Sequence, residues 1–164
     1  MDIFYNEHRL ILENLIRHNV DFILVGGYAV NYHGYNRSTG DMDIWLRPDN
    51  DNKLLLLSAL GEIGYEKAGL DVIEEWDFTK PQGFYIGKDP ERTDFMTFIS
   101  GVTFSETKKM VIAAAIEGLL LPVIQLNDLI KNKTSTGRGK DLIDVEYLEK
   151  IVKLKKTEIS KRRN

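Results

Sequence analysis

The chain has 164 residues, of which 43% are hydrophobic and 29% charged, with a net charge of −3 and no cysteine. Such a chain is long enough to bury one core, cannot form disulfides or thiolate metal sites, and does not favour a basic surface that coats nucleic acid. The charged N-terminus lacks the apolar region of a signal peptide, and the longest apolar run, "GLLLPVIQL", is too short to cross a bilayer. We therefore expect a cytoplasmic protein without membrane contact.

Apolar spacing and turn residues in the first 64 residues predict alternating helices and strands. The predicted elements are an amphipathic helix over 3–18, a buried strand over Phe22–Val25, a helix over 28–34, a strand over Asp41–Leu46 and a helix over 50–64. Gly26 and Gly27 end the first strand, and Gly64 ends the third helix.

The rest of the chain continues the alternation. Strands are predicted around Val72–Phe78 and Phe84–Ile86, over Thr93–Ile99 and over 119–124, and helices over 126–133 and 138–156, with a break at "TSTG". The stretch "FSETKKMVIAA" fits either a helix or a strand. Interleaved strands and helices without a linker indicate one α/β or α+β domain.

Two carboxylates interrupt the apolar strand "DMDIWL". Asp41 and Asp43 are two residues apart, so in a strand their side chains point to the same face. Asp94 is a third acid in an apolar run and is the candidate for a neighbouring strand. Hard cations such as Mg²⁺ favour such oxygens together with substrate phosphates. A calcium loop is excluded, because Trp45 and Leu46 stand at loop positions 5 and 6, where a third oxygen ligand and a glycine belong.

Glycines and cations flank this acidic pair. Gly26 and Gly27 in "VGGYAV" allow a phosphate to approach the backbone, although any tight strand-to-helix turn also uses glycine. Arg37, in the loop before Asp41, is a possible phosphate or carboxylate partner. The C-terminal "LIKNKTSTGRGKD" is not a P-loop, since Thr134 replaces a required glycine.

The charged residues of that C-terminal stretch have two interpretations. Lys133, Arg138 and Lys140 are candidate phosphate contacts around a helix break. Alternatively, Asp141 stabilises a helix N-terminus and Lys140 pairs with Asp144 at i,i+4. The basic end "KIVKLKKTEISKRRN" is either a solvated helix end or a segment that holds RNA.

The remaining polar and aromatic residues carry weaker signals. The three histidines, His8, His18 and His33, have no metal-ligand spacing and are expected at the surface or at helix ends. Tyr28 and Tyr32, beside the glycine turn, are candidates to border a nucleotide.

Together these residues resemble the nucleotidyltransferase superfamily typified by DNA polymerase β, in a small stand-alone branch that includes minimal nucleotidyltransferases and AbiE-type toxins. That family combines a glycine turn, a G-x-x-R-x-T-x-D-x-D motif, a third acidic strand residue and a K…GR-x-KD-x-x-D element. The matching positions are Gly26, Gly27, Gly34, Arg37, Thr39, Asp41, Asp43 and Asp94, then Lys133, Gly137, Arg138, Lys140, Asp141 and Asp144.

The resemblance implies an α+β fold, with a small mixed sheet flanked by helices and a C-terminal helical element. One domain over 1–164 would comprise an N-terminal helix (1–20), a catalytic core (21–122) and C-terminal helices (123–164). The implied activity is transfer of a nucleoside monophosphate from an NTP to an acceptor hydroxyl on a tRNA, a protein or a small molecule.

The resemblance also implies roles for single residues. Asp41, Asp43 and Asp94 would hold Mg²⁺ or Mn²⁺, and Asp94 would take the proton of the acceptor hydroxyl. The nucleotide would be bound by Gly26, Gly27, Arg37, Thr39, Lys133, Arg138, Lys140 and Asp141.

A non-catalytic alternative stays open at this point. A toxin–antitoxin-type or regulatory module would use the same fold to bind a partner, and a helical HEPN-type protein is the partner that the family implies. An intact acidic triad favours the enzyme, because a pure binding module gains nothing from burying three carboxylates.

Overall fold

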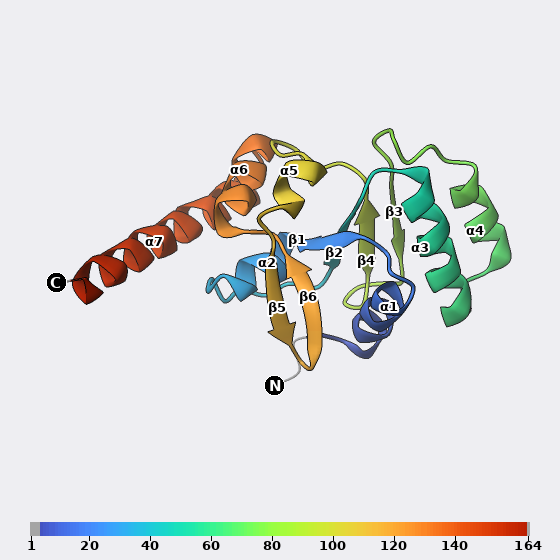
Figure 1. The fold of residues 1–164 in the computed structure, drawn as a ribbon, viewed down its shortest axis with the longest axis horizontal. Coiled ribbons are helices and arrows are strands. Elements are labelled where there is room, and N and C mark those ends of the chain that lie inside the picture. Colours follow the sequence, from blue (N-terminus) through green and yellow to red (C-terminus); the bar gives the residue numbers. More distant parts are fainter. Residues whose placement is uncertain (1–3, 164) are drawn as a thin grey trace.

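The computed structural model describes residues 4–163, in which seven helices surround a six-stranded sheet (Figure 1). The helices are α1 (Asn6–Arg17), α2 (Gly26–Tyr32), α3 (Asn50–Ile63), α4 (Lys67–Glu74), α5 (Phe104–Lys108), α6 (Leu126–Thr136) and α7 (Gly139–Arg162). The strands are β1 (Phe22–Val25), β2 (Met42–Leu46), β3 (Gly83–Ile86), β4 (Thr93–Met96), β5 (Ile112–Ile116) and β6 (Leu119–Val123). This arrangement confirms the predicted α+β class.

The sheet is mixed, with the strand order β3-β4-β2-β1-β6-β5. Strands β1 and β2 are antiparallel, whereas β2 pairs in parallel with β4 and β1 in parallel with β6. The hairpin partners β3 and β5 form the two edges. The middle of the sheet is therefore built from β1, which ends at the glycine turn, and β2, which has the acidic pair at its start.

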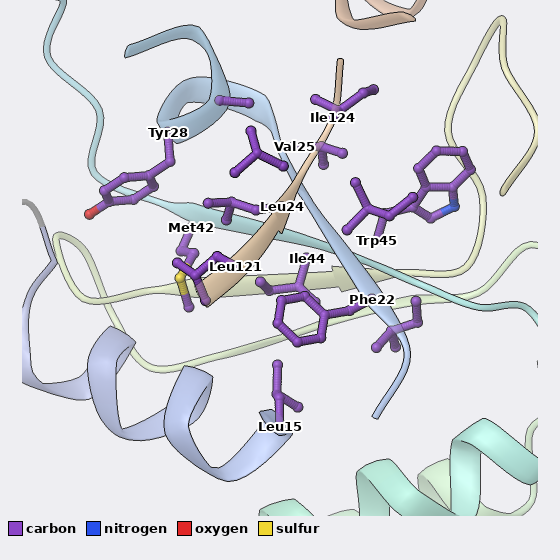
Figure 2. Close-up of a cluster of buried hydrophobic side chains, with 14 of the residues drawn as sticks. Leu15, Phe22, Leu24, Val25, Tyr28, Met42, Ile44, Trp45, Leu121 and Ile124 are labelled. Atoms are coloured by element: carbon purple, nitrogen blue, oxygen red, sulfur yellow. The ribbon is translucent and has the colours of Figure 1, made fainter. Parts of the chain in front are cut away.

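The core lies on both faces of the central strands. Alternation along β2 points Ile44 to the face covered by α1, where Figure 2 shows it near Leu15. Trp45 points to the other face, where its ring meets Phe104 of α5 with a centroid distance of 5.2 Å. Asp43, between Ile44 and Met42, shares the face of Trp45, so the acidic pair is directed away from α1.

Local signals set the ends of α3, and its end at Gly64 is as predicted. The Asp49 carboxylate accepts a hydrogen bond from the backbone N–H of Asn52, and Gly64 ends the helix in a left-handed conformation. Gln125 caps α6 through its side-chain oxygen. These caps explain why the bounds of both helices follow from short sequence patterns.

Two predictions for the middle of the chain were wrong. The segment around Val72 is not a strand, because α4 packs on α3 with Ile73 buried and Val72 exposed. The β-branched residues Val72 and Ile73 favour a strand, but the contact with α3 decided the conformation. Strand β4 ends at Met96, three residues before the predicted end. The stretch 104–114, which fitted either a helix or a strand, divides into α5 and the start of β5.

The two ends of the chain differ from the compact middle. Residues 1–3 of the predicted N-terminal helix lie outside the described residues, and α1 starts at Asn6. Helix α7 extends away from the sheet, so that its C-terminal half lies apart from the other elements in Figure 1. Within residues 4–163, no helix combines the length and apolar character needed to cross a membrane.

Candidate functional site

A pocket of about 380 Å³ lies where the end of β1, the loop before β2, the segment after β4 and the α6–α7 junction meet. Its walls include most of the predicted site residues. They are Gly26, Gly27, Arg37, Thr39, Asp41, Asp43, Lys133, Arg138, Lys140 and Asp141. The structure therefore brings together residues that are more than one hundred positions apart in the sequence.

The three acids lie on adjacent strands. Asp43 of β2 and Asp94 of β4 are direct partners in the parallel ladder, so both point to the same face of the sheet. Asp41 precedes Asp43 by two residues and lines the pocket with it. Asp94 does not line the pocket. The strand pairing thus places the third acid beside the pair, as predicted.

The glycine turn makes room for two polar side chains. Gly26 has a φ of +66°, and a Cβ placed there would be 1.9 Å from Oδ2 of Asp43. A Cβ on Gly27 would be 2.2 Å from Oγ1 of Thr39. The Gly27 N–H also donates a hydrogen bond to the Asp43 carboxylate. Both glycines are therefore needed by the protein's own close packing at the pocket.

Negative charge is concentrated at this end of the pocket. Burial, followed by the charges of Asp94 and Asp41, raises the pKa of Asp43 to about 6, although Lys133 and the Gly27 N–H oppose this. Burial also raises the pKa of Asp41, and a hydrogen bond with Asp89 adds to the effect. A cation placed among these carboxylates would relieve the repulsion.

Arg92 neutralises the third acid. Its Nη2 lies 2.7 Å from Oδ1 of Asp94, and its guanidinium lies 3.9 Å from the ring centroid of Tyr85. Within residues 4–163, no three His, Cys, Asp or Glu side chains are arranged to hold a metal ion. Asp94 is therefore already paired with a cation of the protein.

Arg37, Lys133 and Asp141, which line the pocket, belong to an ion network with the buried Asp144. Asp144 accepts two hydrogen bonds from Arg37, from Nε at 2.7 Å and from Nη2 at 2.9 Å, and its Oδ2 lies 2.8 Å from Nζ of Lys133. Lys133 also lies 2.9 Å from Asp141. The Asp144 side chain is only 1% exposed. The predicted i,i+4 pair of Asp144 with Lys140 is not formed, because α7 turns Asp144 toward the loop before β2.

This network leaves few cations for a ligand. Burial raises the pKa of Asp141, but hydrogen bonds from Thr136, Lys133 and Arg138 outweigh it and lower the pKa to about 2. Arg37 and Lys133 are thus committed to carboxylates of the protein. Arg138 has a side chain that is 76% exposed, and Lys140 is exposed and makes no ion pair within the described residues. Arg138 and Lys140 are the cations available to an anion entering the pocket.

The histidine prediction was wrong for His8, whereas His33 lies at a helix end as predicted. His8 is fully buried, with Nδ1 3.0 Å from the Tyr28 hydroxyl and Nε2 2.9 Å from the Arg92 carbonyl oxygen. His33 is buried at the end of α2, with Nε2 2.7 Å from the Ile124 carbonyl oxygen. Burial lowers the pKa of each ring. Both histidines are structural links between distant segments.

Sequence reasoning missed part of the pocket wall. Met96, Phe98, Ile99 and Ser100 approach from the segment after β4, and Asn132 and Thr136 approach from α6. The hydroxyl of Thr136 donates to Asp141, and the amide of Asn132 donates to the Ser100 carbonyl oxygen at 2.9 Å. Tyr28 and Tyr32, predicted to border a nucleotide, line a separate groove along α2. No local sequence pattern marks the missed residues as part of a pocket.

Comparison with known proteins gives a likeness of fold. No protein-family model and no curated protein sequence matches the chain. Among solved structures, the solution structure of the antibiotic-resistance factor ANT(2″)-Ia superimposes with a TM-score of 0.54 at 12% sequence identity, over 96% of this chain and 91% of that one. At this identity the likeness establishes the fold alone.

Proposed function

We propose that the protein is a metal-dependent nucleotidyltransferase that uses an NTP as donor. One observation carries the proposal: three acids meet on the paired strands β2 and β4, beside a pocket that also holds two exposed cations. Asp41 and Asp43 both have raised pKa values in this position, so their charged forms are unfavourable unless a cation and a polyphosphate complete the site. The likeness of fold supports the same reaction class.

The donor groups at the pocket fit a hard divalent cation. Asp41 and Asp43 offer carboxylate oxygens on one face of β2, and such oxygens are the ligands that Mg²⁺ and Mn²⁺ prefer. Asp94 would join them after its carboxylate leaves Arg92. The bound metal would supply the positive charge that neutralises the triphosphate near the reacting phosphorus.

The protein's own residues would position the reactants. Arg138 and Lys140 would contact phosphate oxygens, and Gly26 and Gly27 would let the phosphates approach the backbone. The acceptor hydroxyl would attack the α-phosphorus and lose its proton to Asp94, while pyrophosphate leaves. Arg37 and Lys133 would act indirectly, by holding the loop before β2 against α7.

Calorimetric titration with a nucleotide that cannot react tests the site. The α,β-methylene analogue of ATP keeps the triphosphate but lacks the bond that transfer breaks. We expect the wild-type protein to bind it only with Mg²⁺ or Mn²⁺, and Asp43→Asn to bind at least about tenfold more weakly. Asp71→Asn, which changes an exposed acid on α4, is the matched control. Equal binding by the wild type and Asp43→Asn would refute the site.

A nucleotide-binding module with little or no catalysis is the second candidate. The observation in its favour is the ion pair of Arg92 with Asp94, which neutralises the proposed base. This candidate predicts metal-dependent nucleotide binding without pyrophosphate release, and the toxin–antitoxin role implied by the resemblance belongs to it. Release of labelled pyrophosphate from an NTP, in the presence of an acceptor, separates the two candidates.

The acceptor class is tested by the transfer itself. A tRNA, a protein hydroxyl, including that of a helical HEPN-type partner, and a small molecule are the acceptors that the resemblance implies. Incubation of an α-labelled NTP with total RNA, with a co-encoded protein and with an aminoglycoside identifies the one that becomes labelled. Asp43→Asn in parallel shows that the label depends on this site.

A further inference from the structure

The pocket wall contains an aromatic ring that the protein itself does not use. We propose that Phe98 is the platform on which the base of the bound nucleotide stacks. The inference rests on the proposed function and adds where the base lies and which contact holds it. Because every base has a flat π-face, a stacking contact accepts all four NTPs and favours the larger purines.

Phe98 is exposed where its neighbours are buried. Its ring is 58% exposed, whereas Phe95 and Ile99 on either side are in the core. Among the large apolar side chains that are exposed within residues 4–163, Phe98 is the one that lines this pocket. Single exposed apolar residues are common on proteins, so exposure alone carries no argument. Its place in the wall of a polar pocket is the informative observation.

The backbone around Phe98 is fixed. Thr97 accepts a hydrogen bond from the Gln82 N–H through Oγ1 at 2.9 Å, and its own N–H donates to the Gln82 carbonyl oxygen at 3.0 Å. Ile99 is buried in the core, and the Ser100 carbonyl oxygen accepts from Asn132 of α6 at 2.9 Å. The ring is therefore held toward solvent by anchored neighbours.

The next residue strengthens this anchoring. Gly101 has a φ of +83°, and a Cβ there would lie 2.8 Å from Cβ of Ser135 and 2.9 Å from the Lys131 carbonyl oxygen. The chain after Phe98 thus packs against α6 as closely as a glycine permits. A platform fixed in this way loses little conformational freedom when a flat ligand covers it.

The position of Phe98 suits a base whose phosphates lie at the acids. Phe98 follows Asp94 by four residues, so the two are at most roughly 13 Å apart along the chain. The acids, Gly26 and Gly27 form one part of the pocket wall, and Phe98 contributes an apolar surface to the same pocket. An NTP can thus place its triphosphate at the acids and its base on the ring.

Two ligands test the contact with the base and the contacts with the phosphates separately. In calorimetric titrations with Mg²⁺, we expect Phe98→Ala to bind the α,β-methylene analogue of ATP between about 5-fold and about 150-fold more weakly, which is the loss of one base–aromatic stack of about 1–3 kcal/mol. Binding of inorganic tripolyphosphate, which has no base, should be unchanged. Phe98→Trp should retain nucleotide binding, and Phe98→Leu should retain only part of it.

Leu120→Ala is the matched control, because it removes another exposed apolar side chain, 66% exposed and outside the pocket. It should leave both affinities unchanged. A 2-aminopurine nucleotide gives an independent signal, since its fluorescence should fall on binding to the wild type and much less on binding to Phe98→Ala.

The outcomes distinguish this inference from the proposed function. If the wild type binds tripolyphosphate and nucleotide, and Phe98→Ala binds each of them as tightly as the wild type does, the base lies elsewhere and the inference is wrong. The proposed function then still stands. If Phe98→Ala weakens both ligands alike, Phe98 shapes the phosphate site and the stacking role is refuted. If the wild type binds neither ligand, the proposed function fails and the stacking role fails with it.

Discussion

The substitution Asp144→Asn tests the ion network that joins α7 to the loop before β2. The Asp144 side chain is 1% exposed and contacts Arg37 and Lys133 through three N–O distances between 2.7 and 2.9 Å. Asparagine keeps the shape of the side chain but removes its charge and one acceptor oxygen. The guanidinium of Arg37 is then left buried without its carboxylate.

The expected effect is large because both partners are sheltered from water. Removing one member of a buried ion pair costs about 3–5 kcal/mol of the free energy of unfolding. With a urea m-value of about 2 kcal/mol/M, the unfolding midpoint should fall by about 1.5–2.5 M. Since Arg37 precedes Thr39 by two residues, the loop that carries Thr39 and Asp41 should also loosen, and nucleotide binding should weaken.

Urea unfolding followed by circular dichroism measures this effect. Asp71→Asn breaks an exposed i,i+4 pair with Lys67 and should change the free energy of unfolding by no more than about 0.5 kcal/mol. The double variant Arg37→Met, Asp144→Leu should recover part of the loss, because no unpaired charge remains. If Asp144→Asn is as stable as Asp71→Asn, the network does not exist in solution.

Two further changes test neighbouring features. The folded pKa of Asp141, about 2 against an ordinary 3.8, means that its charged form contributes about 2 kcal/mol above about pH 4, and that this is lost as the pH falls toward 2. Urea midpoints should therefore drop more steeply with acid for the wild type than for Asp141→Asn, and parallel curves would contradict the assignment. Gly26→Ala should abolish metal-dependent nucleotide binding, because its Cβ would displace the Asp43 carboxylate. Gly118 has a similar positive φ but open space around it, so Gly118→Ala should lower stability slightly and leave nucleotide binding intact. If Gly26→Ala and Gly118→Ala affect nucleotide binding equally, the close-packing argument is refuted.

Much of the local structure follows from short sequence patterns. Strands β1 and β2 were predicted almost to the residue, because uniform apolar runs bounded by glycine and proline encode buried strands. Helix α3 begins after Asp49 and ends at Gly64 because both residues satisfy backbone groups within their own turn. The shared face of Asp41 and Asp43 is likewise a property of strand geometry alone.

The function of the pocket residues depends on partners that the sequence does not place. The sequence left Arg37 as a phosphate or carboxylate partner, and the structure pairs it with the carboxylate of Asp144, 107 positions away. Asp94 was correctly expected beside Asp43, but its pairing with Arg92 depends on how the side chains fill space after the strands meet. Such contacts arise from which segments pack together, and no local pattern records this.

The sequence by itself thus determined the fold class, the central strands, the glycine turn and the acidic pair, because strand periodicity and helix caps act over a few neighbouring residues. The tertiary structure alone decided that α4 is a helix, that His8 is buried, that Arg138 and Lys140 are the exposed cations at the pocket, and that Phe98 faces the pocket. These features depend on burial and charge pairing between distant segments, which exist only once the chain has folded.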